Sequence, residues 1–291
     1  MIPALVRDRT ALATARKGLG SPVVLVPTMG ALHAGHRGLL RRARELAGSG
    51  GSVIVSVFVN PLQFGPRDDL DRYPRTLDED IKVCHDDGVA VLFAPGTADM
   101  YAEPPMVTID PGSVGDRLEG EFRPGFFRGV LTIVIKLFGI TRPDIAVFGE
   151  KDAQQLALVR RMVADLDLGV QIAAVPTVRD PDGVAVSSRN SYLSAAERST
   201  AQFLNRALQA AREEAAYGPG KAVAAAQRVL AAAAAADPPL KVDYLSLAEP
   251  GTFTPVGENH VGPAVLALAA RVGATRLIDN SMLEFWPRER A

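Results

Sequence analysis

Short and uniformly apolar runs recur along the chain up to residue 175. They lie at residues 23–26, 53–59, 89–93, 145–148 and 170–175. Their lengths suit β-strands, and their apolarity at every position is typical of strands buried on both faces of a parallel sheet, because a half-exposed strand alternates apolar with polar residues. The pattern therefore predicts a parallel sheet and not an antiparallel one.

Amphipathic stretches separate these runs. Residues 36–47 and 152–166 carry apolar side chains three and four positions apart, which predicts helices with one buried face. Thr76 and Glu79 match a capping box and predict the start of another helix. Strands and helices in alternation predict a doubly wound α/β domain, which binds its ligands beyond the carboxyl ends of the strands.

The pattern changes after about residue 186. A long helix is expected from Ser194, and an alanine-dense helix over residues 221–236. Apolar runs that predict strands follow at residues 242–247, 264–269 and 276–279. We therefore predict two domains, a larger α/β domain at residues 1–185 and a smaller α+β domain at residues 186–291.

Charge and cysteine content narrow the classes of function. The chain has 32 basic and 33 acidic residues and a formal net charge of -1, so no global field attracts it to nucleic acid or to an anionic membrane. Its one cysteine, Cys84, can form neither an intrachain disulfide nor a cysteine-rich metal site. Charged residues 7–9 interrupt any apolar signal core, and no apolar run approaches the roughly 18 residues of a spanning helix. We expect a cytoplasmic protein that binds neither nucleic acid nor membranes.

The most informative segment, residues 26–36, follows the first predicted strand and opens the first helix. It places His33 and His36 three positions apart beside backbone N–H groups. A helix N-terminus attracts anions, and two imidazoles at this spacing can face one phosphate group, while Gly30 and Gly35 let the backbone approach it. A zinc site is the alternative, but no third ligand with metal spacing is nearby. The segment predicts a phosphate-binding site.

A second polar segment follows the predicted strand at residues 145–148. Lys151 brings a compact positive charge to the same edge of the sheet, where it suits a triphosphate. Asp152 has a helix-capping role as its structural alternative. Gln155 lies one turn further on and suits a small polar substrate, with an ordinary surface glutamine as the alternative. The segment predicts a second contribution to a nucleotide site.

A third polar segment contains Ser187, Ser188 and Arg189, at the predicted domain junction. Two hydroxyls and a guanidinium suit the oxygens of a pyrophosphate leaving group, because charge-assisted hydrogen bonds strengthen as charge develops. A loop or helix-capping role explains the segment equally well when it is taken alone. A fourth segment, after the second strand, carries Asn60 and Gln63, whose amides recognise hydroxyl and carboxylate groups; Asn60 before a proline is also a common turn.

Together these segments resemble the motifs of the pantothenate synthetase family, the pantoate beta-alanine ligases of the nucleotidylyltransferase superfamily. The resemblance extends over residues 23–192, with further similarity at residues 242–245 and 276–280. It implies a Rossmann-like domain with a His-x-Gly-His signature at residues 1–185, a C-terminal lid domain at residues 186–291, and a homodimer. It also implies that ATP, pantoate and beta-alanine are the substrates, joined to pantothenate through a pantoyl adenylate with release of AMP and pyrophosphate.

The resemblance assigns roles to individual residues. It places Gln63 and Gln155 on pantoate, with Gln63 also meeting beta-alanine. Asn60 is a further substrate-binding candidate, given by its residue type and its place after the second strand. His36 is the position of the proton donor. The catalytic set is His33, His36, Lys151, Ser187, Ser188 and Arg189. The implied ATP site is Met29, Gly30, Ala31, Leu32, His33, Ala34, Gly35, His36, Gly149, Glu150, Lys151, Asp152, Val178, Val186, Ser187, Ser188 and Arg189.

This chain departs from the family pattern at two places. In a segment implied to be a mobile loop, residues 123–129, Phe126 stands where relatives often carry histidine. Some members are described with a metal cluster whose matching positions here are Glu79, Asp80 and Val83, and valine cannot bind a metal. We therefore expect Mg2+ to arrive with ATP, since this ion retains phosphate and water ligands.

Three alternative functions remain open at this point. A nucleotidyltransferase of the same superfamily would leave AMP on its product, and amine-dependent release of AMP distinguishes it. A regulatory module that binds a nucleotide without turnover is excluded by any release of pyrophosphate. A dinucleotide-dependent dehydrogenase is disfavoured because no strand is followed by Gly-x-Gly-x-x-Gly.

Overall fold

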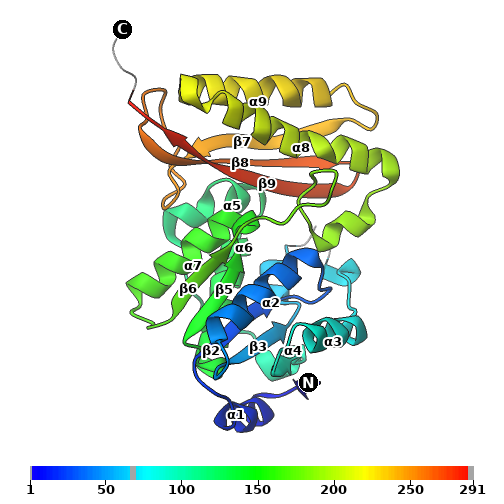
Figure 1. The fold of residues 1–291 in the computed structure, drawn as a ribbon, viewed down its shortest axis with the longest axis vertical. Coiled ribbons are helices and arrows are strands. Elements are labelled where there is room, and N and C mark those ends of the chain that lie inside the picture. The colour runs from blue at the N-terminus through cyan, green and yellow to red at the C-terminus, as the bar shows by residue number, and fades with distance from the viewer. Residues whose placement is uncertain (1, 66–69, 288–291) are drawn as a thin grey trace. The chain divides into compact units, whose positions relative to one another are not determined.

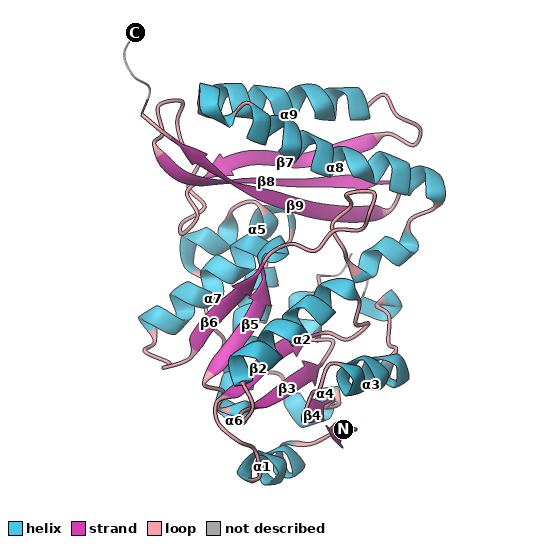
Figure 2. Ribbon diagram, in the orientation of Figure 1, coloured by secondary structure: helices cyan, strands magenta, loops and turns pink. Residues whose placement is uncertain are grey.

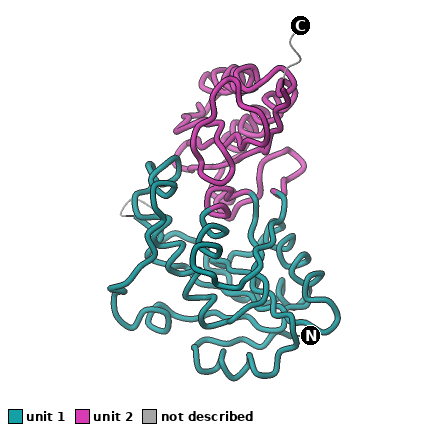
Figure 3. The backbone as a smooth tube through the Cα atoms, turned by 90° about the vertical axis from the view of Figure 1, so that its left-hand side faces the viewer, with its two compact units in different colours: residues 1–150, 158–176 teal, residues 151–157, 177–291 magenta. Residues whose placement is uncertain are grey.

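The computed structural model describes residues 2–65 and 70–287, and the chain forms two compact units. Figure 3 shows the first unit, residues 1–150 and 158–176, in teal, and the second, residues 151–157 and 177–291, in magenta. The compact units thus divide the chain before Thr177. The functional boundary after residue 185 stays a prediction.

The first unit contains a parallel sheet with the strand order β1-β4-β3-β2-β5-β6, of which Figure 1 labels β3, β2, β5 and β6. Its strands are β1 (Ala4–Val6), β2 (Val23–Thr28), β3 (Ser52–Val57), β4 (Val91–Phe93), β5 (Ile145–Gly149) and β6 (Gln171–Val175). The five apolar runs of the sequence are β2 to β6, as predicted. The three-residue β1 is too short to give a pattern of its own and was not predicted.

Helices connect and cover these strands (Figure 2). They are α1 (Arg9–Lys17), α2 (Ala34–Ala47), α3 (Leu77–Asp86), α4 (Thr97–Met100), α5 (Glu119–Phe122), α6 (Phe126–Thr141) and α7 (Ala153–Asp165). Leu40 and Ala43 of α2 pack with Cys84 of α3 on Val24 and Val53 of the sheet. The alternate residues of the central strands are buried as well, so both faces of the sheet are covered and the Rossmann-like prediction is confirmed.

Two local predictions were wrong. Thr76 is the N-cap of α3, so the helix begins where it was predicted. The capping box with Glu79 does not form, because the Thr76 side chain makes no capping bond and its hydroxyl lies 3.5 Å from the carboxylate of Asp80. Residues 123–129 are not a loop throughout, because α6 begins at Phe126. Most residues of α6 are apolar and buried, and only a few polar positions mark its exposed side, so a helical period is hard to recognise in its sequence.

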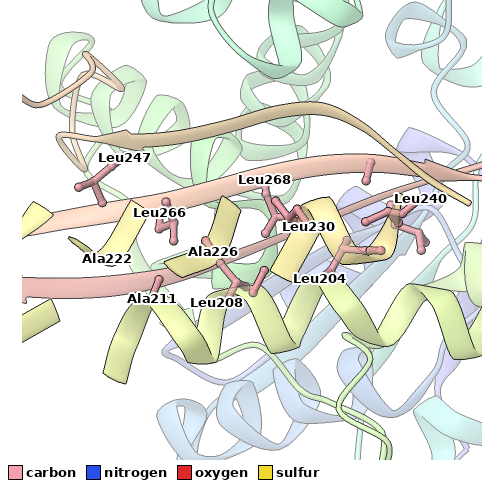
Figure 4. Packing of buried hydrophobic residues seen from close by; sticks show 14 of the residues in the cluster. Leu204, Leu208, Ala211, Ala222, Ala226, Leu230, Leu240, Leu247, Leu266 and Leu268 are labelled. Carbon is pink, nitrogen blue, oxygen red and sulfur yellow. The ribbon is translucent and has the colours of Figure 1, made fainter. Parts of the chain in front are cut away.

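The second unit has a three-stranded antiparallel sheet in the order β7-β8-β9. Its elements are α8 (Ala195–Glu213), α9 (Pro219–Ala233), β7 (Leu240–Ala248), β8 (Gly262–Val272) and β9 (Thr275–Phe285). Figure 4 shows Leu208 and Ala211 of α8, and Ala226 and Leu230 of α9, packed toward Leu266 and the rest of the sheet. Two helices on an antiparallel sheet confirm the predicted α+β class.

The start of α8 follows its sequence closely. Ser194 is the N-cap, its hydroxyl accepts the N–H of Glu197, and the Glu197 carboxylate accepts the N–H of Ser194. This reciprocal pair satisfies two N–H groups that the first helical turn leaves without partners. In the described parts of the chain, no helix has the combined length and hydrophobicity needed to cross a bilayer.

Candidate active site

The two histidines form the N-terminus of α2. His33 is the N-cap, and its Nδ1 accepts the N–H of Gly35 at 3.2 Å, while Nδ1 of His36 accepts the N–H of His33 at 3.3 Å. The rings are stacked with centroids 4.0 Å apart. A ring nitrogen that accepts a hydrogen bond carries no proton, so the neutral form of each imidazole carries its proton on Nε2.

The loop between β2 and α2 is held by Asp80 of α3. One carboxylate oxygen accepts the N–H of Leu32 at 2.7 Å and the other that of Ala31 at 3.1 Å. The side chain is 1% exposed. Burial raises the pKa of the Asp80 carboxyl, whereas the hydrogen bonds from Leu32 and Ala31 favour its ionised form. Asp80 thereby fixes the backbone immediately before the histidines.

The same loop requires glycine at position 30. Gly30 has φ +83°, and Ala31 follows with φ +52°, so two successive residues adopt the left-handed region that most side chains avoid. A Cβ atom on Gly30 would lie 2.8 Å from Cγ1 of Val57 and 2.9 Å from Oδ2 of Asp80. Both the dihedral angle and the close approach therefore exclude a larger residue.

The metal cluster implied at Glu79, Asp80 and Val83 does not fit this geometry. Both oxygens of Asp80 accept backbone N–H groups, Val83 offers no ligand atom, and Glu79 is exposed. Among residues 2–65 and 70–287, no group of three or more His, Cys, Asp or Glu side chains is arranged to hold a metal ion. The carboxylate instead has a structural role, and no step of the chemistry below depends on a metal bound there.

Beyond β3, the two predicted amides lie together. Asn60 is the N-cap of a short 3₁₀ turn (Pro61–Gln63), which agrees with the turn alternative for this residue. Its Nδ2 donates to Oε1 of Gln63 at 3.2 Å, and Nε2 of Gln63 lies 2.9 Å from Sδ of Met29, in the loop that follows β2. The structure therefore brings Met29, Asn60 and Gln63 together at the carboxyl edge of the sheet.

The sheet order reverses between β2 and β5. From β2 the chain proceeds to β3 and β4 on one side, and then returns to add β5 and β6 on the other. Open α/β sheets bind ligands where the order reverses, beyond the carboxyl ends of the strands. The histidine loop follows β2 at this point. Gly149 is the last residue of β5, and Glu150 comes directly after it. The predicted residues of the first unit therefore lie where the topology places a ligand.

The remaining predicted residues belong to the second unit. Lys151 and Asp152 lie in a short 3₁₀ turn (Glu150–Asp152), with Nζ of Lys151 3.9 Å from Oδ1 of Asp152. The carbonyl of Lys151 accepts a hydrogen bond from Nδ2 of Asn280 at 2.8 Å, which ties this turn to β9. Gln155 follows in the first turn of α7.

Val178 and Val186 are joined across a turn, because the N–H of Val186 donates to the carbonyl of Val178 at 2.9 Å. Arg179 supports this turn through two bonds to the buried carboxylate of Asp279, at 2.6 and 2.9 Å. The hydroxyl of Ser187 accepts the N–H of Arg189 at 3.3 Å and caps the 3₁₀ turn Ser188–Tyr192. The segment thus has the capping role that was its structural alternative, and its role toward a nucleotide stays a prediction.

Sequence patterns missed Tyr101, whose hydroxyl donates to Oδ1 of Asn60 at 3.1 Å, and the structural role of Asp80. Tyr101 lies 41 residues from Asn60, and Asp80 lies 48 and 49 residues from the N–H groups it accepts. Such contacts leave no local periodicity. Only the fold brings these residues to the loops after β2 and β3.

Comparison with known proteins gives matches over nearly the whole chain. The family model for pantoate-beta-alanine ligase matches residues 4–282. Pantothenate synthetase of Thermobifida fusca is 58% identical over 284 residues, covering 96% of this chain and 95% of the relative. That of Streptomyces coelicolor is 50% identical over 329 residues, covering 98% of this chain and 97% of the relative.

Solved structures that resemble this chain belong to the same family. The crystal structure of pantothenate synthetase from Thermus thermophilus has a TM-score of 0.88 at 43% identity, covering 98% of this chain and 100% of that chain. The pantoate-beta-alanine ligase of Francisella tularensis, solved with beta-gamma ATP and beta-alanine, has a TM-score of 0.78 at 31% identity, covering 96% and 97%. The chain belongs to the pantoate-beta-alanine ligase family.

Proposed function

We propose that this protein condenses pantoate with beta-alanine to pantothenate, consuming ATP and releasing AMP and pyrophosphate. The observation that carries the proposal is a family match over residues 4–282 combined with two stacked imidazoles at the start of α2, at the point where the sheet order reverses. The relative from Francisella tularensis was solved with an ATP compound and beta-alanine, which supports the same two substrates here.

The chemistry requires activation of a carboxylate, which is a poor acyl electrophile at neutral pH. A carboxylate oxygen of pantoate attacks the α-phosphorus of ATP, the bond from that phosphorus to the bridging oxygen breaks, and pyrophosphate leaves. The amine of beta-alanine then attacks the acyl carbon of the pantoyl adenylate, loses a proton, and displaces AMP. Catalysis of such phosphoryl transfer rests on positioning and on charge stabilisation.

Residues of both units have a role in this proposal. His33 and His36 donate to phosphate oxygens through Nε2, and His36 is the proton donor. Lys151 and the segment Ser187, Ser188 and Arg189 stabilise the charge of the departing pyrophosphate. The ATP site further includes the residues named for it above, while Gln63 and Gln155 hold pantoate.

No protein nucleophile takes part in the proposed route. Cys84 is buried in α3, and burial raises its pKa to about 12, so the thiol is not ionised at neutral pH. A thiol in that state is a poor nucleophile, because the thiolate is the reactive form. This supports direct transfer between the bound substrates.

Three further features complete the proposal. Mg2+ enters with ATP, because the ion keeps phosphate and water ligands more readily than it enters an all-protein site. The protein works in the cytoplasm, where ATP is made, and it acts as a homodimer, as the family resemblance implies. Sedimentation equilibrium would test the last feature by giving twice the mass of the chain.

A product assay tests the function. The protein is incubated with ATP, Mg2+ and pantoate, with and without beta-alanine, and pyrophosphate, AMP and pantothenate are measured separately. We expect pyrophosphate to depend on pantoate, and AMP and pantothenate to appear only when the amine is added. Pyrophosphate without any amine-dependent AMP would identify a nucleotidyltransferase that keeps AMP on its product, and no pyrophosphate at all would refute the proposal.

A further inference from the structure

The side chain of Asn60 is fully engaged within the protein. It is 1% exposed. Oδ1 accepts the N–H of Leu62 at 3.3 Å and the hydroxyl of Tyr101 at 3.1 Å, and Nδ2 donates to the carbonyl of Gly129 at 3.1 Å and to Oε1 of Gln63 at 3.2 Å. A primary amide has two N–H donors and two acceptor lone pairs, so these four bonds use its whole capacity. Asn60 has nothing left with which to bind a substrate directly.

The backbone fixes which way the amide of Asn60 points. The N–H of Leu62 is a donor and the carbonyl of Gly129 is an acceptor, and neither can exchange its role. Rotation of the amide by 180° would place two donors face to face at Leu62 and two acceptors face to face at Gly129, at a buried position where unmade hydrogen bonds are costly. Nδ2 of Asn60 must therefore point toward Gln63.

The fixed amide of Asn60 sets the amide of Gln63 in turn. Because Asn60 presents a donor, Gln63 must present Oε1 to it, and its Nε2 then lies on the opposite side, toward the loop that follows β2. There Nε2 is 2.9 Å from Sδ of Met29, and a thioether sulfur is only a weak acceptor. Gln63 is 9% exposed, so its orientation is held in a largely buried setting.

Tyr101 completes this arrangement from another element. Tyr101 comes directly after α4 in the chain, and its hydroxyl supplies the second hydrogen bond to Oδ1 of Asn60. Burial raises the pKa of Tyr101 to about 12, so the hydroxyl keeps its proton and stays a donor over the whole neutral range. The ring is also held in place, with Nζ of Lys136 4.8 Å from its centroid and the ring of Phe58 beside it.

We propose that Asn60 and Tyr101 are positioning residues, which hold Gln63 with its amide N–H toward the acid substrate. This part of the site therefore accepts a hydroxyl or carboxylate oxygen of the substrate and rejects a hydrogen-bond donor. The inference rests on the proposed function, because the oxygen it assigns belongs to pantoate. It gives Asn60 a different role from direct substrate binding. It also fixes Gln63 as a hydrogen-bond donor to the substrate, whereas a glutamine amide can in general either donate or accept.

Two substitutions test whether Asn60 and Tyr101 set the orientation of Gln63. Asn60→Asp is isosteric but replaces the donor Nδ2 with an acceptor, so Gln63 has to turn its own NH2 group toward position 60 and present its oxygen to the substrate. A hydrogen bond to a charged group contributes about 1.5 to 3 kcal/mol, which corresponds to about a 10- to 100-fold rise in KM for pantoate. Tyr101→Phe removes one hydroxyl and keeps the ring, and we expect a rise of about 2- to 10-fold from the loss of a neutral hydrogen bond. KM for ATP should stay within about twofold in both variants.

The controls separate positioning from general damage. Tyr217→Phe makes the same change at a side chain that is 63% exposed, and should leave both KM values unchanged. Equal rises in KM for pantoate and for ATP, or no change in either for Tyr101→Phe, would overturn the inference. Tyr101→Phe preserves the packing and carries the test even where Asn60→Asp lowers the yield of folded protein. Failure of the proposed function is distinct, because the unmodified protein would then form no pantothenate at all.

Discussion

His33 and His36 each commit one ring nitrogen to the start of α2. Nδ1 of both rings accepts a backbone N–H, so the fold itself selects the tautomer that carries its proton on Nε2. The N–H groups of a first helical turn have no intrahelical partners, and capping side chains usually satisfy them. Imidazoles in this place therefore stabilise the helix and present donors at a positive helix end, which suits a triphosphate.

Replacement of His36 should separate these two roles. We expect His36→Ala to lower kcat by about 100- to 1000-fold, as removal of one donor to a developing oxyanion does, while loss of its hydrogen bond from the N–H of His33 costs about 1 kcal/mol of stability. Steady-state rates and thermal unfolding measure the two effects. His85→Ala, an exposed histidine of α3, is the matched control and should change neither. A near-normal rate for His36→Ala would remove His36 from the proposed catalytic set.

Asp80 acts on the same loop without touching a ligand in the proposed mechanism. Asp80→Asn replaces one carboxylate oxygen with an NH2 group that faces a backbone N–H of Ala31 or Leu32. The loss of a charge-assisted bond and the opposed donors should loosen the turn at Gly30 and lower kcat/KM for ATP by about 10- to 100-fold. Glu79→Gln is the matched control, and we expect it to have no effect.

The variants Asp80→Asn and Glu79→Gln also test whether these side chains bind a metal ion. Calorimetric titration of the protein with Mn2+ in the absence of ATP should show no binding that depends on either side chain. If Glu79→Gln matched Asp80→Asn in its loss of activity, or if Mn2+ bound and either substitution abolished that binding, the structural role of Asp80 would be incorrect.

At the scale of elements, α6 and the 3₁₀ turn Pro61–Gln63 approach each other closely at Gly129. A Cβ atom on Gly129 would overlap the carbonyl group of Leu62 and approach the N of Gln63. The carbonyl of Gly129 also accepts the hydrogen bond from Asn60. Close packing of this helix thus depends on the absence of a side chain at one position, and the orientation of Gln63 depends on that packing.

Gly129→Ala should therefore destabilise the protein. Both neighbours are backbone atoms that cannot turn aside, so α6 must move, at an expected cost of about 1 to 3 kcal/mol in the free energy of unfolding. Gly139→Ala lies in the same helix, where a Cβ atom meets nothing within 4 Å, and should be neutral or stabilising by about 0.5 to 1 kcal/mol. Urea unfolding of the two variants measures the difference. Equal stabilities would show that the close approach of α6 is not a constraint.

The sequence predicted those elements whose patterns are unambiguous. Strands β2 to β6 are apolar at nearly every position and α8 opens with Ser194 and Glu197, so both were identified from local residues. Helix α6 was missed because most of its residues are apolar and buried, and β1 because three residues carry no period. In the candidate site, the motif residues could be proposed from the sequence because they cluster in the chain, and their roles stay predictions. Asp80 and Tyr101 act through contacts between distant segments that only the fold creates.

At the scale of the whole molecule, the proposed chemistry draws on both compact units. The first unit holds His33 and His36, and the second holds Lys151 and the segment Ser187, Ser188 and Arg189. The net charge of -1 provides no general attraction for a polyanion, so these local donors and cations must account for nucleotide binding. The proposed function requires that one ATP molecule engage both sets of residues.

Amide hydrogen exchange tests this link directly. Addition of ATP and Mg2+ should slow exchange in residues 29–36 of the first unit and in residues 186–190 of the second, because a bound ligand suppresses the local opening that permits exchange. Both segments should respond with the same ATP midpoint, since one ligand produces both effects, while α9 (Pro219–Ala233), which contributes no proposed ligand contact, should exchange as before. Protection confined to one of the two segments, or two different midpoints, would mean that the histidines and the Ser187 segment do not bind the same nucleotide.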